Sequence, residues 1–318
     1  MESKPTAVTH SPRFGEGYGD FVMQSSDNVL FHFPKAILQH ASPFFQDLFS
    51  ISSHADNAGD RTNAQPLVME EDSMTLDILL QWIHPAQIIP SINSTTIARF
   101  LGAAHKYQME KIIEWFEREV TTGEGTTCAI KSHQSLLSTN PMLVLSLAER
   151  YCLPELARLA LRRAIIEPTS SLLTNNAEIS HTMWKHLLLL RKERTDWFMK
   201  RIDAMEQSHH KGRSKICWSC HSLVMSWAWR LNDVPSWQFV GDDTPKPSYG
   251  CNCVSPQRQT HRNEEKHYNG FGAPVISRSR SSSPIPSRSI ILESDQLSVD
   301  AKAMELQLPE LPKGLFEA

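Results

Sequence analysis

The first fifty residues carry the pattern that most constrains the fold. A polar turn at 25–28 is followed by alternating side chains from Val29 to Phe33, which predicts a β-hairpin with one buried aromatic face. Pro34 cannot continue a central strand but suits the start of a helix. Pro43, with Ser42 as its cap, then divides the following apolar stretch into two short helices. A hairpin running into helices favours a mixed α+β domain.

The next seventy or so residues, by the same local rules, predict more helices and one more strand. Residues 50–65 are rich in Ser, Asn, Asp and Gly and are predicted to form a flexible loop. The further expected features are a short strand at Pro66–Met69, a helix capped by Asp72 or Ser73, a helix from near Ser94, and a turn at Gln108–Met109 before another helix. This order of strands and helices is typical of the α+β class.

The order and spacing from about Gly15 to Val120 resemble the BTB/POZ domain, a small sheet capped by helical hairpins. The segments that carry the resemblance are Asp20–Met23, Phe33–Leu38, Ala41–Phe49 and Leu79–Pro85. The last of these, with its tryptophan and closing proline, is similar to the BTB proteins expanded in filamentous fungi of the basidiomycete type. The resemblance implies a protein-interaction module. It also implies self-association, because a charged pair at the positions of Asp20 and Lys35 lies near the two-fold interface of BTB dimers.

Many BTB proteins dock a cullin scaffold as adaptors of ubiquitin ligases, and such members usually carry an apolar-x-Glu motif after a Leu-Phe pair. Here Leu48–Phe49 is followed by Ser50–Ala55, which contains no glutamate. This departure favours a self-associating adaptor or scaffold, with a cullin-dependent substrate adaptor as the alternative. A nuclear or transcription regulator is a second alternative, through the Arg-Ser run at 277–284. Nucleic-acid binding is not expected, because the Cys-rich segment before that run offers few bases for phosphate contacts.

An internal repeat extends the helical pattern beyond the BTB region. Residues 104–112 align with residues 148–156, and both read as a helix that ends in a basic residue and Tyr before a new amphipathic helix. Two copies are too few for a solenoid. They indicate that helical hairpins continue, as in the BACK-like extension often found behind a BTB domain, with Pro141 and Pro154 each suited to start a helix. The expected organisation is a disordered leader at 1–14, the BTB domain at 15–122, a helical extension at 130–206, a Cys/Trp-rich segment at 207–256 and a disordered tail at 257–318.

The Cys/Trp-rich segment holds the strongest candidate for chemistry. Two cysteine pairs, each spaced closely enough to chelate, offer the thiolates of a tetrahedral zinc site. The four ligands would be Cys217, Cys220, Cys251 and Cys253, with His209 or His221 as substitutes for one of them. The alternative is a set of free cysteines packed among tryptophans. A c-type haem attachment or a redox Cys-x-x-Cys fits less well, because the chain shows no export route and no βαβ unit.

Composition narrows the remaining classes. The formal net charge is −3, which gives no field to steer the chain onto nucleic acid or an anionic membrane. The longest apolar runs, such as Leu187–Leu190, are far shorter than the roughly 20 residues of a membrane span, and the first 18 residues contain no apolar signal-peptide core. No phosphate loop, nucleophile elbow or His-Glu-x-x-His motif is present. We therefore expect a protein that is not an enzyme, located in the cytoplasm, the nucleus or both.

Overall fold

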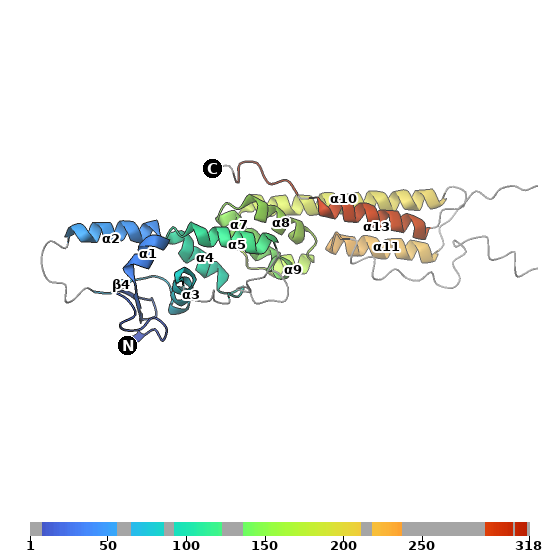
Figure 1. Ribbon diagram of the computed structural model, residues 1–318. Coiled ribbons are helices and arrows are strands. Elements are labelled where there is room, and N and C mark those ends of the chain that lie inside the picture. Colours follow the sequence, from blue (N-terminus) through green and yellow to red (C-terminus); the bar gives the residue numbers. More distant parts are fainter. Residues whose placement is uncertain are drawn as a thin grey trace, which may run out of the picture. The chain divides into compact units, whose positions relative to one another are not determined.

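The computed structural model describes residues 8–55, 65–85, 92–122, 136–210, 218–236, 290–307 and 309–316 (Figure 1). It confirms the expected fold class, with a small mixed sheet and helices followed by a helical extension. The described residues fall into two compact units. The first draws on Met1–Arg163, Ala177–Ile179 and Leu311–Ala318, and the second on Ala164–Asn176 and Ser180–Glu310.

The strands are β1 (Thr9–His10), β2 (Phe21–Gln24), β3 (Val29–Phe33) and β4 (Leu67–Val68). The helices of the first unit are α1 (Lys35–Ala41), α2 (Pro43–Ala55), α3 (Ser73–Ile83), α4 (Ile97–Lys106), α5 (Glu110–Thr122), α6 (Leu136–Thr139), α7 (Pro141–Arg150) and α8 (Pro154–Ile165), whose last two residues cross into the second unit. The second unit adds α9 (Thr169–Thr174), α10 (His181–His210), α11 (Trp218–Asp233) and α13 (Ile290–Leu306). Every helix in these ranges is too short or too polar to span a membrane.

The predicted hairpin is confirmed and forms the centre of the sheet. The strand order is β1-β3-β2-β4, with β2 and β3 antiparallel and Phe21 opposite Phe33. β1 joins β3 and β4 joins β2 in parallel. The alternation along β3 buries Phe31 and Phe33 completely, together with Met23 of β2. The hairpin turn uses Asn28 at φ 65°, a conformation that Asn adopts more readily than most residues.

The leader is the first correction to the sequence-based expectation. Residues 8–14 belong to the folded domain instead of forming a disordered segment, because β1 pairs with β3 and the Phe14 side chain is fully buried. The Phe14 ring packs edge-on against Phe33 at 5.3 Å and against Tyr18 at 5.1 Å between centroids. A two-residue strand and one aromatic ring leave no periodicity for sequence reasoning to detect. Residues 1–7 lie outside the described part of the chain.

Ser42 confirms the predicted break between two helices. Its backbone is extended at φ −148°, its side chain accepts the Phe45 N–H at 3.2 Å, and the same hydroxyl donates to the Tyr107 carbonyl at 2.5 Å. This buried hydroxyl therefore ties the start of α2 to the end of α4. The helix α2 then continues through Ala55, into the range 50–65 that we expected to be a loop. Residues 56–64 are not among those described.

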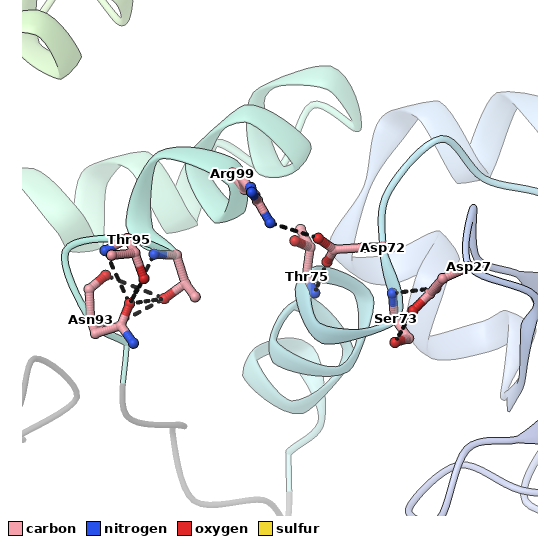
Figure 2. Close-up of polar contacts among 8 residues, drawn as sticks. Asp27, Asp72, Ser73, Thr75, Asn93, Thr95 and Arg99 are labelled. Carbon is pink, nitrogen blue, oxygen red and sulfur yellow. Dashed lines mark hydrogen bonds and ion pairs between the residues drawn. The ribbon is translucent and has the colours of Figure 1, made fainter. Parts of the chain in front are cut away.

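The start of α3 is held by two carboxylates (Figure 2). Asp72, one of the two predicted caps, accepts the Thr75 N–H at 2.7 Å and the Arg99 guanidinium at 2.9 Å. Asp27 from the hairpin turn accepts the Ser73 N–H at 2.8 Å. Burial raises the pKa of each carboxyl, but these hydrogen bonds outweigh it and hold both pKa values below the ordinary range.

The helix α4 begins at Ile97, later than the expected start near Ser94, and a turn built on Asn93 precedes it. Asn93 accepts the N–H groups of Thr95 and Thr96 at 3.0 and 2.9 Å (Figure 2). An Asn side chain often closes a turn in this way, by accepting backbone N–H groups a few residues further on.

The internal repeat is a repeated helix ending. Both α4 and α7 end at a Tyr and are followed by a residue in the left-handed region, Gln108 at φ 56° and Cys152 at φ 54°. This geometry is the Schellman motif, which normally places Gly at that position. The matching closing hydrogen bonds are Met109 N–H to Ala104 O and Leu153 N–H to Ala148 O, both 2.8 Å. The two helical hairpins are therefore built by the same local rule.

The helical extension begins as predicted. Pro141 is the first residue of α7, which Asn140 caps by accepting the Leu143 N–H at 3.2 Å, and Pro154 opens α8. The extension packs on the BTB-like part, since the rings of His105 and Tyr151 lie 5.4 Å apart. Most of the described residues from 136 to 210 are helical, close to the expected 130–206.

Arg191 is the polar centre of the second unit. Its guanidinium is 7% exposed and donates to the carbonyls of Ile165 at 2.6 Å, Glu167 at 2.6 Å and Asp233 at 2.7 Å. These carbonyls lie at or just after the ends of α8 and α11, where helical carbonyls have no intrahelical partner. One side chain of α10 therefore satisfies the ends of two other helices.

Within the described parts of the last two segments, the helices α11 and α13 differ from expectation. We expected an aperiodic Cys/Trp-rich stretch at 207–256 and a disordered tail at 257–318. Instead, α11 and α13 lie beside α10 as helices (Figure 1). Their shared core is made of Phe198 and Ile202 from α10, Trp227 and Leu231 from α11, and Leu297 and Ala301 from α13. Residues 237–289 lie outside the described ranges.

Candidate interaction surface

The hairpin places Asp20 at the beginning of α1. Because Phe21 faces Phe33 across the hairpin, the residue before Asp20 passes very close to the opposite strand. A Cβ atom at Gly19 would lie 2.2 Å from the Phe33 carbonyl carbon, so only glycine fits there. This close approach brings a residue from before β2 next to the helix that follows β3.

Asp20 acts as a cap supplied from outside the helix. Its Oδ1 accepts the backbone N–H of Lys35 at 2.8 Å, at the first residue of α1. The residue in the cap position, Pro34, has no side chain that can accept this hydrogen bond. The structure therefore brings together the predicted Asp20 and Lys35, but the hydrogen bond that joins them is between a carboxylate and a backbone amide.

The Lys35 side chain lies over two aromatic rings. Its Nζ is 5.5 Å from the centroid of Phe49 and 6.0 Å from that of Phe21, and these rings meet edge-on at 4.8 Å. A cation over the face of a ring is held by the ring quadrupole. Phe49 is buried, Phe21 is half-buried, and both Asp20 and Lys35 are exposed. The surface therefore carries an exposed carboxylate and an exposed ammonium, and the ammonium lies over two aromatic rings.

Exposed apolar residues occur on the same domain. Ile51, on α2 just beyond Phe49, is 72% exposed, and Val68 of the edge strand β4 is 71% exposed. Sequence reasoning did not identify either residue. Their apolar character alone gives no signal, because burial depends on what packs over them in the fold.

A polar cluster ties β4 to α4. Lys106 pairs with Glu70 at 2.8 Å and with Glu71 at 3.0 Å, and the Tyr107 hydroxyl donates to Glu71. Burial first, and then the Glu71 carboxylate, raise the pKa of Tyr107, so this hydroxyl stays protonated and remains a donor. The cluster fixes the fold and offers no free nucleophile.

A surface hollow of about 630 Å³ lies between β1 and the first turns of α3. His10, Arg13 and Asp77 are among its lining residues, and the Arg13 and Asp77 side chains approach to 3.6 Å. Burial raises the pKa of Asp77, against the opposing effect of Arg13. The two opposite charges in the hollow therefore partly compensate each other.

The candidate zinc ligands fall largely outside the described residues. Cys217, Cys251 and Cys253 lie in undescribed segments, and Cys220 lies in the first turn of α11 with its side chain undescribed. Within the residues that the structure describes, no group of three or more His, Cys, Asp or Glu is arranged to hold a metal. The zinc site therefore stays a prediction.

The small sheet and the helices that follow it form the architecture expected from the resemblance to BTB domains. Residues 12–123 match the family model of the BTB/POZ domain, and the chain is accordingly a BTB domain-containing protein. This family is a family of protein–protein interaction modules, not of enzymes. A comparison with curated proteins finds no match.

Proposed function

We propose that the chain is an adaptor or scaffold that self-associates through its BTB domain. The observation that carries the proposal is the exposed Lys35 ammonium over Phe21 and Phe49, beside the exposed Asp20 carboxylate. These positions correspond to the charged pair near the two-fold interface of BTB domains that dimerise. The chain, which resembles the fungal BTB set, would act in the cytoplasm or nucleus.

The two charges suit a symmetric interface. In a two-fold dimer the same patch occurs on both copies, so Asp20 of one copy can face Lys35 of the other, and the contact is made twice. The Lys35 N–H occupies one oxygen of Asp20, which leaves acceptor capacity on this exposed carboxylate. Because both side chains are already held in place in the free chain, Asp20 of one copy can meet Lys35 of the other without rearrangement of the hairpin.

The test is the mass of the full chain in solution, measured by sedimentation equilibrium across a range of concentrations. One chain is 36.1 kDa, and the proposal expects twice that mass for the wild type. Lys35→Glu should dissociate the dimer, because it places two like charges at each contact. Lys111→Glu, a charge reversal at an exposed position of α5, is the matched control and should stay dimeric.

A mixing experiment makes the test specific. Asp20→Lys and Lys35→Glu chains should each be monomeric alone, yet a mixture should regain the dimer, because both contacts of the mixed dimer again join opposite charges. A wild type that stays at the mass of one chain would end the proposal. So would a Lys35→Glu chain that dimerises as well as the Lys111→Glu control.

A cullin-dependent substrate adaptor is the alternative. The exposed Ile51 favours it, since it offers an apolar anchor at the end of α2. The absence of a glutamate in Ser50–Ala55 counts against it. A pull-down with a cullin scaffold distinguishes the two functions: capture that is lost on Ile51→Asp supports the ligase adaptor, and no capture from wild type excludes it.

We also propose that Cys217, Cys220, Cys251 and Cys253 bind one zinc ion. Metal analysis of the purified full chain should give about one zinc per chain. Cys217→Ser should remove most of it, whereas the same change at Cys152, an exposed free cysteine, should leave the zinc content unchanged. Wild-type protein without zinc would refute the site.

A further inference from the structure

Phe198, Ile202, Trp227 and Leu231 of α10 and α11 form an apolar surface, here called the groove, that is covered by a helix from much later in the chain. α13 contributes Leu297 at 3% exposure and Ala301 at 0% to the core formed by α10 and α11, and Met304 packs partly against it. In the sequence, α13 is separated from α11 by residues 237–289. The groove and the helix that occupies it are therefore distant in sequence.

The direction and register of α13 are set by charge. Arg194 of α10 pairs with Glu305, and Arg201 pairs with Asp300 at 3.3 Å. Because the later residue of α10 meets the earlier residue of α13, the two helices run antiparallel. The Arg194–Glu305 pair is largely buried, with side chains 8% and 15% exposed, so it specifies register more strongly than a surface pair would.

Two features distinguish α13 from a helix that only completes a core. Its other faces are not polar throughout, since Val299 is 60% exposed and Leu306 is 73% exposed. In addition, the Arg194 Nε–H is buried and makes no hydrogen bond to the described residues. A guanidinium can bind a carboxylate with two parallel N–H donors. Glu305 therefore leaves part of the recognition capacity of the groove unused.

We propose that the α10–α11 groove is a binding site for an amphipathic helix of a partner protein, and that α13 occupies it in the resting chain as an internal ligand. The partner helix would repeat the pattern of α13: Leu, then a small residue four positions later, then Met and a carboxylate seven and eight positions after the Leu. The carboxylate binds Arg194, and the apolar residues contact Phe198, Ile202, Trp227 and Leu231. Binding of the partner requires displacement of α13.

The probe for this site is a fluorescein-labelled peptide of residues 290–307, added to the full chain and followed by fluorescence anisotropy. Leu297→Asp removes the buried anchor of α13 in the chain and should open the groove. Val299→Asp, the same kind of change at an exposed position of the same helix, is the matched control. We expect the peptide to bind Leu297→Asp at least tenfold more tightly than it binds the wild type or Val299→Asp.

A second part of the experiment tests the contribution of the Arg194–Glu305 charge pair to binding. A peptide carrying Glu305→Gln should bind the Leu297→Asp chain at least fivefold more weakly than the native peptide. The added substitution Arg194→Met in the chain should abolish this difference between the two peptides. Equal binding of the peptide to open and control chains, or no binding to either, would overturn the proposal.

Hydrogen exchange of the wild-type chain guards against the case in which Leu297→Asp unfolds the second unit. The proposal expects the amides of α13 to exchange faster than those of α10 and α11 in their shared part, because α13 leaves while the groove persists. Equal protection of the three helices, or cooperative loss of all three in the variant, would show that α13 is an integral core helix and would overturn the proposal.

Discussion

Asp20 offers the sharpest test of how the candidate interaction surface is built. If its carboxylate acts as the cap of α1, then Asp20→Ala removes one hydrogen bond to a backbone N–H that has no other helical partner. Loss of such a cap costs about 1 kcal/mol, within a range of roughly 0.5 to 2. Asp20→Asn keeps an oxygen acceptor at the same place and should cost only a few tenths of a kcal/mol.

Lys35→Ala probes the other half of the pair. It leaves the backbone N–H in place and removes the ammonium from the rings of Phe21 and Phe49, at a cost of about 0.5 to 1 kcal/mol for an exposed site. Since the cap bond and the ring contact are separate interactions, the double variant should cost about the sum of the two single changes.

The assay is hydrogen exchange of the α1 amides in the full chain, because the two compact units make a single global unfolding transition a poor measure. A loss of about 1 kcal/mol lowers protection about fivefold. Asp20→Ala should show this loss at the start of α1, and Asp20→Asn should not. Equal losses for Asn and Ala, with a strong non-additive coupling to Lys35→Ala, would show that a side-chain ion pair dominates, and the capping account would be wrong.

Three further predictions concern stability, each measured as the change in hydrogen-exchange protection of the affected unit in the full chain. Gln108→Gly should raise the stability of the first unit by about 1 kcal/mol, because Gly adopts φ 56° without strain, whereas the same change at Gln46, inside α2, should lower it by a similar amount. Asp72→Asn should flatten the acid dependence of stability. The lowered pKa of this carboxyl means that its contribution is present above its unfolded pKa, and that it is lost as pH falls through the folded value below 3.8. Arg191→Lys should destabilise the second unit by about 3 kcal/mol or more, because an ammonium cannot reach carbonyls at the ends of both α8 and α11.

Features set by local rules could be predicted from the sequence. The alternation from Val29 to Phe33 predicted the central hairpin, because one face of a strand is buried. Pro141 and Pro154 predicted two helix starts, because proline restricts the backbone wherever it occurs. The repeat around Tyr107 and Tyr151 was likewise readable, since a helix ending is a short-range structure.

Features set by contacts between residues distant in sequence could not be predicted from the sequence. Phe14 and β1 belong to the domain only because β3 offers an edge and a pocket for the ring. α13 is a helix whose apolar residues lie on several faces, so periodicity gave no signal, and its packing depends on a groove that only the fold creates. Trp227 and Trp229 lie two positions apart and so on opposite faces of α11, and only the fold decides that the Trp227 face is covered while Trp229 is 80% exposed.

The candidate interaction surface lies between these two cases. The resemblance to BTB domains identified Asp20 and Lys35, but the bond between them runs through a backbone amide, which is present at every position and so leaves no mark in the sequence. This bond has a consequence for binding. The hydrogen bond from the Lys35 N–H holds the Asp20 side chain, and two aromatic rings hold the long side chain of Lys35. Both charges are therefore ordered before a partner binds. Ordering a flexible charged side chain at an interface costs about 0.5 to 1.5 kcal/mol, and here part of that cost falls on folding instead of on association. An exposed pair that would otherwise contribute little can in this way favour one partner geometry over others.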